Sequence, residues 1–395
     1  MKHFIQEHRE DDVRQLALQA NRYPDIDIPY ALTQIAGWQS IRNKVPTWAA
    51  CSDIIYPSHL PLEQCSSEVA ALYKYGVVST SGHTDSLVDL TGGFGIDCWF
   101  MSRAFQRVIY VERQEELAKI AEHNFNILNN NCNSSFVNCQ SEEWLHECQR
   151  PVSWFFLDPA RRDEHGGKTV AISDCEPDVC ALEEILVEKA SKIMVKLSPM
   201  LDLNLACHQL KHIQEAHIVA IDNECKELLL ILSKDCESDA DNMPIFCVNI
   251  RKSETQVFVF CKQEEKFSTC QMAESIGHYL YEPNASIMKA GAFRCICQRY
   301  ELKKLQANSH LYTSNEYLAD YPGRIFEVEA ISDFGKKNLK TFLTDLHKAN
   351  LTVRNFPASV ADLRKRFHLQ EGGDIYLFAT MLHPQQKILI RCRKV

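Results

Sequence analysis

The sequence has no apolar run long enough to cross a membrane and no apolar segment near its first residue. Its densest apolar stretch, Leu228–Leu232, is far shorter than the roughly 20 residues that a spanning helix needs. The opening residues, MKHFIQEHREDD, are charged from the second position onward, unlike a secretory signal. We therefore expect a cytoplasmic protein with no membrane partner.

The sequence also lacks the cysteine spacing of a zinc site. It has 17 cysteines, but none occur as Cys-x-x-Cys, and the closest pair is Cys295 and Cys297. Structural zinc needs paired thiolates at short, repeated spacing. We therefore expect reduced thiols buried as small apolar side chains. His208, His212 and Glu215 fall at helical spacing, but isolated surface histidines explain them more simply, so we expect no metal.

Positive charge is scarce in the chain as a whole. The net charge is −9, which argues against a protein that binds nucleic acid over its entire surface. Residues 321–395 are the exception, with 13 Lys and Arg against 7 Asp and Glu. They contain a cluster that is a candidate for contact with an RNA backbone: Arg364, Lys365, Arg366, Arg391 and Arg393. A solvated charged face is the alternative.

The pattern of apolar residues divides the chain into a helical and an α/β part. Residues 1–80 have apolar residues at helical spacing. Short apolar runs alternate with helical stretches after that, which is typical of a doubly wound parallel sheet. The runs are Leu87–Leu90, Val108–Val111, Phe136–Val137, Trp154–Leu157, Ile193–Leu197, His217–Ile221 and Leu228–Leu232.

The last two runs are too close for a crossover helix, because only Asp222–Glu227 separate them. We expect them to form an antiparallel hairpin at one edge of the sheet. The predicted fold is therefore α/β, with a mostly parallel, seven-stranded, Rossmann-like sheet and two small α+β domains towards the C-terminus. The predicted domains are a helical domain, the sheet domain, a ferredoxin-like domain and a basic domain, at residues 1–80, 81–235, 243–320 and 321–395.

A glycine-rich loop follows the first predicted strand. It runs through Asp89, Thr91, Gly92, Gly93 and Gly95 and leads into a helix. Glycines let a backbone turn sharply and approach a ligand closely. In a dinucleotide site such a loop faces a pyrophosphate, and an acid beside it would be unfavourable. The carboxylate of Asp89 instead suits an ammonium group, so these five residues are candidates for binding a nucleoside cofactor with a cationic end.

Two further positions are candidates for the same nucleoside. Glu112 ends the second strand, 23 residues after Asp89, where an acid can reach both hydroxyls of a ribose. A surface acid at a strand end is the simpler alternative. Gln140 or Ser141, after the third strand, lies where an adenine edge would be recognised.

The fourth predicted strand ends in Asp158-Pro159-Ala160-Arg161. It delivers Asp158 to the carboxyl edge of the sheet, where ligands bind in such folds. A carboxylate and a proline-linked carbonyl are both hydrogen-bond acceptors, and together they can hold an NH or NH2 group in line with a methyl donor. An ordinary Asp-Pro turn is the alternative.

These motifs, in this order, resemble class I methyltransferases that depend on S-adenosylmethionine (SAM). More closely, the chain is similar to bacterial methyltransferases with a C-terminal THUMP-like domain. The stretches that carry the resemblance are DLTGGFGID (89–97), LDPARRD (157–163), DCEPD (174–178), VKLSPMLD (195–202), EPNASIMKAGAF (282–293) and FPASVADLRKRF (356–367). The resemblance implies SAM as the cofactor and RNA, such as tRNA or rRNA, as the substrate.

Within this resemblance, Asp158 and Pro159 match the start of the Asp/Asn-Pro-Pro-aromatic motif of amino-methyltransferases, whereas Ala160 and Arg161 depart from it. Arg161 can still stack on a base through its guanidinium plane. Uridine C5-methyltransferases need a cysteine after the next strand, and Lys196–Pro199 contain none. The sequence therefore favours direct methyl transfer to a base nitrogen of RNA, with Asp158, Pro159 and Arg161 as catalytic candidates.

Three other functions stay open. The chain could methylate a small molecule or a protein. It could also bind SAM or RNA without catalysing a transfer, since the aromatic residue is missing. A nicotinamide oxidoreductase is a more distant alternative, which Asp89 and the hairpin argue against.

Overall fold

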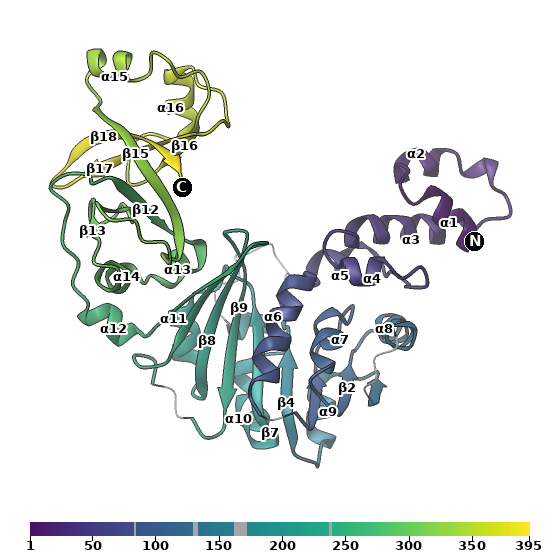
Figure 1. Cartoon of the computed structure of the whole chain (residues 1–395). Helices are drawn as coiled ribbons and strands as arrows, with labels where there is room; N and C mark the ends of the chain where they lie inside the picture. Colours follow the sequence, from purple (N-terminus) through teal and green to yellow (C-terminus); the bar gives the residue numbers. More distant parts are fainter. Residues whose placement is uncertain (83, 129–132, 162–171, 237–238) are drawn as a thin grey trace. The chain divides into compact units, whose positions relative to one another are not determined.

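The computed structural model of the chain describes residues 1–82, 84–128, 133–161, 172–236 and 239–395 (Figure 1). The chain forms two compact units. The first comprises residues 1–216 and 227–238, and the second comprises 217–226 and 239–395. Among the described residues, no helix is both long enough and apolar enough to cross a membrane.

The first unit begins with short helices, as the sequence predicts. They are α1 (Lys2–His8), α2 (Val13–Leu18), η1 (Ala20–Arg22), α3 (Ile28–Ile41), α4 (Pro46–Ala49), α5 (His59–Gln64) and α6 (Glu68–Ser79). Side chains cap the N-termini of several of these helices. Asp27 caps α3, and the Ser67 hydroxyl caps α6 by accepting a hydrogen bond from the Ala70 amide. Helix α6 packs against α7, the first helix of the α/β part.

The sheet of the first unit has the strand order β9-β7-β4-β1-β2-β3. All neighbouring pairs are parallel except β9, which runs antiparallel to β7. The strands are β1 (Ser86–Asp89), β2 (Arg107–Val111), β3 (Asn133–Val137), β4 (Val152–Leu157), β7 (Ala190–Leu197) and β9 (Glu224–Ser233). Helices α7 (Ile96–Ser102), α8 (Glu115–Ile127), α9 (Ser141–Glu147), α10 (Val179–Lys189) and α11 (Leu203–Gln209) lie between strands in the chain, with η2 (Ile172–Asp174) and a small sheet of β5 (Ala160–Arg161) and β6 (Cys175–Glu176).

The predicted hairpin is present, but it is not at the edge of the sheet. Strand β8 (Ile213–Ile221) is joined to β9 by Asp222 and Asn223, which both have positive φ, as a tight two-residue turn requires. In the second unit, β10 (Ile245–Ile250) and then β11 (Thr255–Phe260) follow beside β8. Because β10 pairs beside β8, the hairpin is followed by further strands in the strand order.

The second unit also contains a seven-stranded sheet of order β13-β14-β12-β15-β18-β17-β16. Its strands are β12 (Tyr279–Pro283), β13 (Lys303–Lys304), β14 (Tyr312–Ser314), β15 (Gly323–Asp333), β16 (Asn350–Val353), β17 (Ile375–Leu382) and β18 (Gln386–Lys394). Its helices are α12 (Lys262–Phe267), α13 (Ala285–Ala290), α14 (Phe293–Arg299), α15 (Lys336–Phe342) and α16 (Val360–Phe367).

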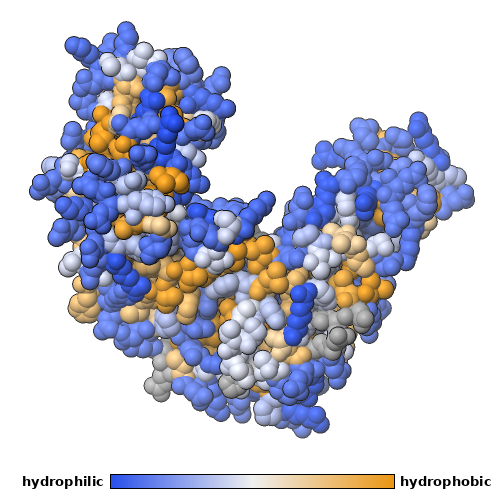
Figure 2. All heavy atoms as spheres, viewed as in Figure 1, coloured by the Kyte–Doolittle hydropathy of each residue, from blue (hydrophilic) through white to orange (hydrophobic). Residues whose placement is uncertain are grey.

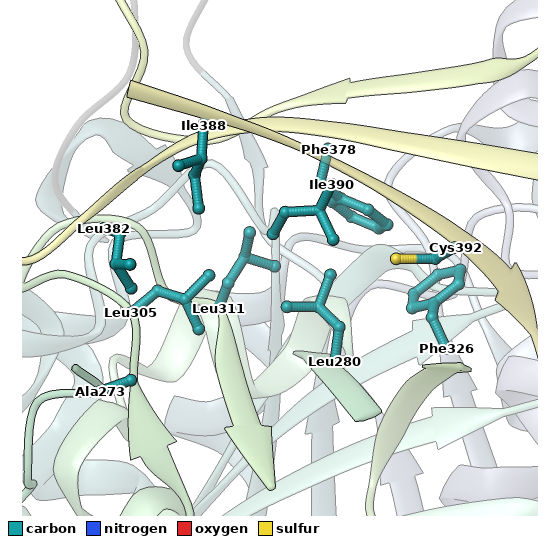
Figure 3. Close-up of a cluster of buried hydrophobic side chains, with 10 residues drawn as sticks. All are labelled: Ala273, Leu280, Leu305, Leu311, Phe326, Phe378, Leu382, Ile388, Ile390 and Cys392. Carbon is teal, nitrogen blue, oxygen red and sulfur yellow. The ribbon is translucent and has the colours of Figure 1, made fainter. Parts of the chain in front are cut away.

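Apolar side chains from residues 273–311 and from residues 326–392 meet in one core on one face of this sheet (Figure 3). Leu280 and Leu311 face Phe326, Phe378 and Ile390 there, and all five are fully buried. A second cluster, which includes Leu339 of α15 and Leu363 of α16, packs around Leu377 and Leu389. The two small α+β regions predicted near the C-terminus thus share one sheet.

One expectation about cysteine is wrong. Cys270 and Cys297 form a disulfide, with 5.7 Å between their Cα atoms. Another 14 described cysteines are outside any disulfide, as expected. The sequence could not predict this bond, because the two cysteines are 27 positions apart and only the fold brings them within bonding distance.

Candidate functional site

A pocket of about 280 Å³ lies in the first unit, where the glycine-rich loop follows β1. Its lining includes eight of the ten residues that the sequence proposes for the cofactor and catalysis: Asp89, Thr91, Gly92, Gly93, Gly95, Glu112, Gln140 and Asp158. Pro159 is buried and is not part of the lining. The side chain of Arg161 lies outside the described part of the molecule.

The glycines of the loop are required by its geometry. Gly93 and Gly95 have φ of +57° and +88°, a region that L-residues rarely adopt. Gly92 has no such strain, but a Cβ there would lie 2.2 Å from the Tyr110 ring. The loop can therefore pack tightly over β2 and present its backbone to the pocket.

Two carboxyl groups accept hydrogen bonds from backbone amides in and near the loop. Glu112 accepts hydrogen bonds from the amides of Gly93 and Gln114, each at 2.8 Å. Asp89 accepts one from the Thr91 amide at 3.0 Å. A pyrophosphate site needs loop amides that are free to donate to the ligand. In this loop, the Thr91 and Gly93 amides are committed to protein carboxylates.

Asp89 is the most strongly perturbed of these acids. Only 1% of the residue is exposed, and this burial raises the pKa of its carboxyl group well above the ordinary value. Asp97, Asp158 and Glu112 raise the pKa further, while the Thr91 amide opposes the shift. The charged groups that act most strongly on this carboxyl group are therefore all acidic, and a cationic ligand in the pocket would supply a positive charge.

The part of the pocket that the structure describes is acidic. Six carboxyl side chains among its described residues line it: Asp89, Asp97, Glu112, Glu142, Asp158 and Glu176. The two basic side chains in this described lining, Arg113 and Lys196, form ion pairs with Glu176 and Asp158. Such a lining favours a ligand with positive charge over one with a diphosphate.

The two candidates for reading an adenine edge have different environments. The Ser141 hydroxyl donates to the Leu90 carbonyl at 2.7 Å, so this buried side chain ties α9 to the loop. Both residues line the pocket, but Gln140 is exposed and caps α9 with Glu143. Gln140 is therefore the better placed of the two to contact a ligand.

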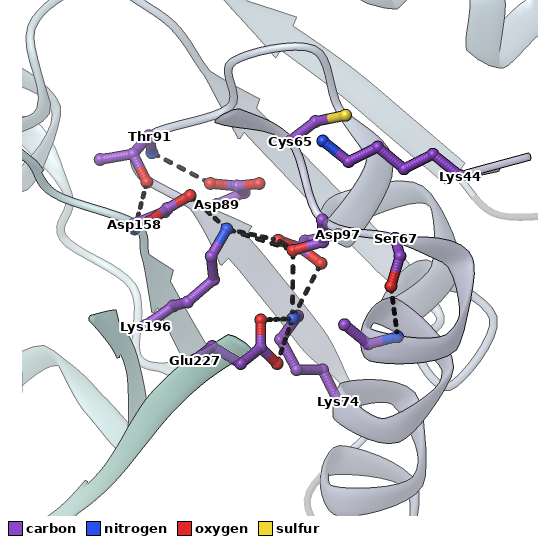
Figure 4. Close-up of polar contacts among 12 residues, drawn as sticks. Lys44, Cys65, Ser67, Lys74, Asp89, Thr91, Asp97, Asp158, Lys196 and Glu227 are labelled. Atoms are coloured by element: carbon purple, nitrogen blue, oxygen red, sulfur yellow. Dashed lines mark hydrogen bonds and ion pairs between the residues drawn. The ribbon is translucent and has the colours of Figure 1, made fainter. Parts of the chain in front are cut away.

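Asp158 is attached to the loop through its backbone. Its amide donates to the Thr91 hydroxyl at 2.6 Å, so the Thr91 side chain joins the loop to the end of β4. Its side chain is 36% exposed, and it accepts a hydrogen bond from Lys196 at the end of β7 (Figure 4). A hydrogen bond therefore connects Asp158, the candidate for orienting the substrate, to the glycine-rich loop.

Five other buried residues at the pocket or next to it were not predicted from the sequence. Lys196 also contacts Asp97 and the Ser66 hydroxyl, and Lys74 of α6 contacts Asp97 and Glu227 (Figure 4). All of these side chains are buried. A lysine within an amphipathic helix or at a strand end is usually solvated, so their sequence pattern carried no signal.

Comparison with known proteins agrees with this architecture. Residues 279–322 match the family model of a ferredoxin-like domain, and residues 323–394 match that of a THUMP-like domain. A solved protein from Porphyromonas gingivalis W83, provisionally named a methyltransferase, is 34% identical, with a TM-score of 0.89. The match covers 100% of this chain and 97% of that one. The chain belongs to this family of methyltransferases with a C-terminal THUMP-like domain.

The family assignment confirms the predicted resemblance and the predicted fold class. More distant solved structures include the M. capricolum TrmK protein with S-adenosyl-homocysteine, at 10% identity and a TM-score of 0.33. That match covers 42% of this chain and 70% of the other. A Pyrococcus horikoshii protein provisionally named an RNA methyltransferase has 12% identity and a TM-score of 0.32, with 48% and 97% covered. Likenesses this weak carry no argument. No curated protein matches the chain.

The basic residues proposed for RNA fall into two groups in this THUMP-like methyltransferase. Arg364, Lys365 and Arg366 lie in the last turn of α16, where Arg364 pairs with Glu371. Arg391 and Arg393 lie on β18 and both pair with Glu329, and Arg391 also pairs with Asp345. The charge of the β18 pair is thus largely balanced by protein acids.

His208, His212 and Glu215, the residues weighed above as metal ligands, do not form a metal site. His212 lies 3.1 Å from Glu183, and its amide donates to the same carboxylate. His208 lies in the last turn of α11, whereas Glu215 lies on β8, so these two residues do not share a helix face. Within the described ranges, no group of three or more metal-ligating side chains occurs.

Proposed function

We propose that this chain is a SAM-dependent methyltransferase that modifies RNA, by direct displacement at a base nitrogen. The observation that carries the proposal is the acidic pocket, in which Asp89 and Glu112 accept hydrogen bonds from loop amides and the two basic side chains of the described lining, Arg113 and Lys196, are both paired with acids. This lining suits an amino acid ammonium and a sulfonium, whereas it would repel a dinucleotide. It therefore also argues against the oxidoreductase.

The donor set of the pocket fits SAM. Asp89 would bind the ammonium group, Glu112 would accept hydrogen bonds from the ribose hydroxyls, and Gln140 would contact the adenine. Gly92, Gly93 and Gly95 keep side chains out of the path of the ligand, and Thr91 fixes the loop to Asp158. When bound, SAM supplies an electrophilic methyl group.

At the acceptor end, Asp158 would accept a hydrogen bond from the NH of the target base, and the carbonyl of Pro159 would accept a second one. Both orient the nitrogen towards the methyl group and exclude water from it. Arg161 would stack on the base, in the place of the aromatic residue that amino-methyltransferases use.

RNA is proposed because of the THUMP-like domain. Hydrophilic side chains dominate the surface over α15 and α16 (Figure 2). Lys336, Lys337 and Lys340 of α15 are exposed, and α16 adds Arg364, Lys365 and Arg366. This group of cations is a better candidate for backbone contact than Arg391 and Arg393, whose charges are paired.

The experiment is tritium transfer from labelled SAM to total RNA, protein and small metabolites of cells that lack the gene. We expect label in the RNA fraction that ribonuclease releases, in tRNA or rRNA. Label that survives ribonuclease but is released by protease, or that stays in the small-molecule fraction, would select those substrates instead. Binding of SAM with no transfer to any fraction would select the catalytically silent alternative.

A further inference from the structure

A row of five charged side chains leads from the pocket into the first unit (Figure 4). It runs from Asp158 at the end of β4 to Lys196 on β7, Asp97 on α7, Lys74 on α6 and Glu227 on β9. Lys196 lies 3.3 Å from Asp97, Lys74 lies 3.2 Å from Asp97, and Lys74 lies 2.7 Å from Glu227. Positive and negative groups alternate along the row.

The row is buried except at the pocket. Lys74 is fully buried, and Glu227, Asp97 and Lys196 are 3%, 8% and 9% exposed. Burying ion pairs is expensive, and apolar side chains of similar volume often give equal or greater stability. Fold stability alone does not explain why this row ends at a partly exposed carboxylate, Asp158, in a ligand pocket.

The hydrogen-bond donors of Lys196 are fully used. An ammonium group has three N–H donors, and those of Lys196 reach Asp158 Oδ2, Asp97 Oδ2 at 3.3 Å and Ser66 Oγ at 3.1 Å. Lys196 therefore has no donor left for a ligand. The other oxygen of Asp158, Oδ1, has no hydrogen-bond partner among the described residues and belongs to a side chain that lines the pocket.

Electrostatics agree with a fixed ammonium. Burial alone would lower the pKa of Lys196, but Asp158 and then Asp97 outweigh it, and the pKa is raised. Burial alone would likewise raise the pKa of Asp97, but Lys74 and Lys196 hold it below the ordinary value. Lys196 and Asp97 are therefore both charged at neutral pH.

We propose that Lys196 is a positioning residue, held by Asp97, Ser66 and the Lys74–Glu227 pair, that fixes Asp158 through Oδ2 so that Oδ1 faces the acceptor group of the substrate. This inference rests on the proposed function, because it assigns Asp158 to the acceptor. It also gives residues 1–80 a part in the site, since Ser66 and Lys74 come from that segment.

The variants are Lys196→Met, which removes the cation, and Lys196→Arg, which keeps it. The Lys196→Met/Asp97→Asn double variant also removes one buried negative charge and preserves the Lys74–Glu227 pair, so it keeps the test valid if Lys196→Met does not fold. Lys192→Met is the matched control, because Lys192 lies on the same strand and bonds only to Gln214 among the described residues.

The first readout needs no ligand. The 13C carboxyl resonance of Asp158, assigned by its loss in Asp158→Asn, should shift or broaden in Lys196→Met and in the double variant but not in Lys192→Met. The second readout is methyl transfer to RNA. Lys196→Met should lower kcat about 10-fold to 100-fold with little change in KM for SAM, and Lys196→Arg should recover part of that loss.

Each result decides the inference. An unmoved Asp158 resonance, or a moved resonance with wild-type kcat, overturns the role of Lys196. A loss of SAM affinity equal to the loss of kcat would also overturn it, because the residue would then support the pocket in general. If the wild-type protein transfers no methyl group, the proposed function fails, while the ligand-free resonance still shows whether Lys196 fixes Asp158.

Discussion

The pocket of the first unit and the THUMP-like domain of the second unit both carry many charges, but the charges have different surroundings. In the pocket, Asp89, Asp97, Glu112 and Lys196 are buried, and these charged side chains are bonded to backbone amides or to other side chains of the site. In the THUMP-like domain, they are largely exposed, and their partners are other surface side chains such as Glu329 and Asp345.

The difference teaches which functional predictions a sequence supports. Asp89, Glu112 and Asp158 each lie at a strand end or in a tight loop, so the local chain sets their positions. Whether a surface arginine is available to bind a phosphate depends on acids that lie far away in the sequence and pair with it in the fold. The pocket should therefore respond to single substitutions strongly, and the basic surface only to several together.

The largest effect is expected from Asp158→Ala. Loss of the acceptor carboxylate should reduce methyl transfer at least about 100-fold, because alignment of the acceptor is lost. Binding of SAM should be retained, as measured by calorimetry. Asp85→Asn, at an exposed position that pairs with Arg107, is the control. Wild-type transfer by Asp158→Ala would remove Asp158 from the mechanism.

Glu112→Gln should weaken SAM binding about 10-fold to 100-fold, since a charged acceptor is lost and the amide NH2 would face the Gly93 or Gln114 amide. Isothermal titration with SAM measures this. Glu116→Gln, at an exposed position in the first turn of α8, should bind SAM like the wild type. Equal affinity in the two variants would mean that Glu112 does not contact the ligand.

Asp89→Asn should have opposite effects on stability and binding. Because the pKa of Asp89 is raised in the folded protein, the stability that its proton contributes is present below the ordinary carboxyl pKa of 3.8 and is lost as pH rises through the raised value. At pH 8 the neutral variant should therefore have a free energy of unfolding about 1 kcal/mol higher than the wild type, and hence a higher unfolding temperature. The gain should shrink as pH falls.

The same variant should bind SAM more weakly, because the carboxylate that balances the ammonium is gone. Thermal unfolding between pH 5 and 8, with and without SAM, measures both effects. A variant that is less stable than the wild type at pH 8, or that binds SAM equally well, would contradict the assignment of Asp89.

The smallest effect per residue is expected on the basic surface. Replacing Arg364, Lys365 and Arg366 together by alanine should weaken RNA binding about 10-fold. The slope of log affinity against log salt concentration should fall by the equivalent of about two to three phosphate contacts. Replacing Arg391 and Arg393 by glutamine should change both less, since those arginines are already paired. Filter binding across a salt series measures this. Equal effects of the two sets would mean that the pairing does not matter for RNA.

Much of the first unit could be predicted from periodicity and spacing. Every predicted strand is present, and only the edge position of the hairpin was wrong, because β10 and β11 pair beyond it. The glycine loop, Glu112 and Asp158 meet at one pocket because parallel strands bring their carboxyl ends to one edge.

The remaining features depend on long-range contacts that no local pattern encodes. Lys74 and Glu227 are separated by 153 positions, and their pairing exists only in the folded protein. The Cys270–Cys297 bond and the partners of Arg391 have the same origin. The domain boundaries at residues 80, 235, 243 and 320 stay predictions.

The most direct test is calorimetric titration of the purified protein with SAM, S-adenosyl-homocysteine and NAD under identical conditions. The acidic pocket predicts saturable binding of SAM and of its demethylated product at one site, and no heat from NAD. Binding of NAD together with indifference to both methionine nucleosides would contradict the central claim, because loop amides held by Asp89 and Glu112 could not then be what selects the ligand.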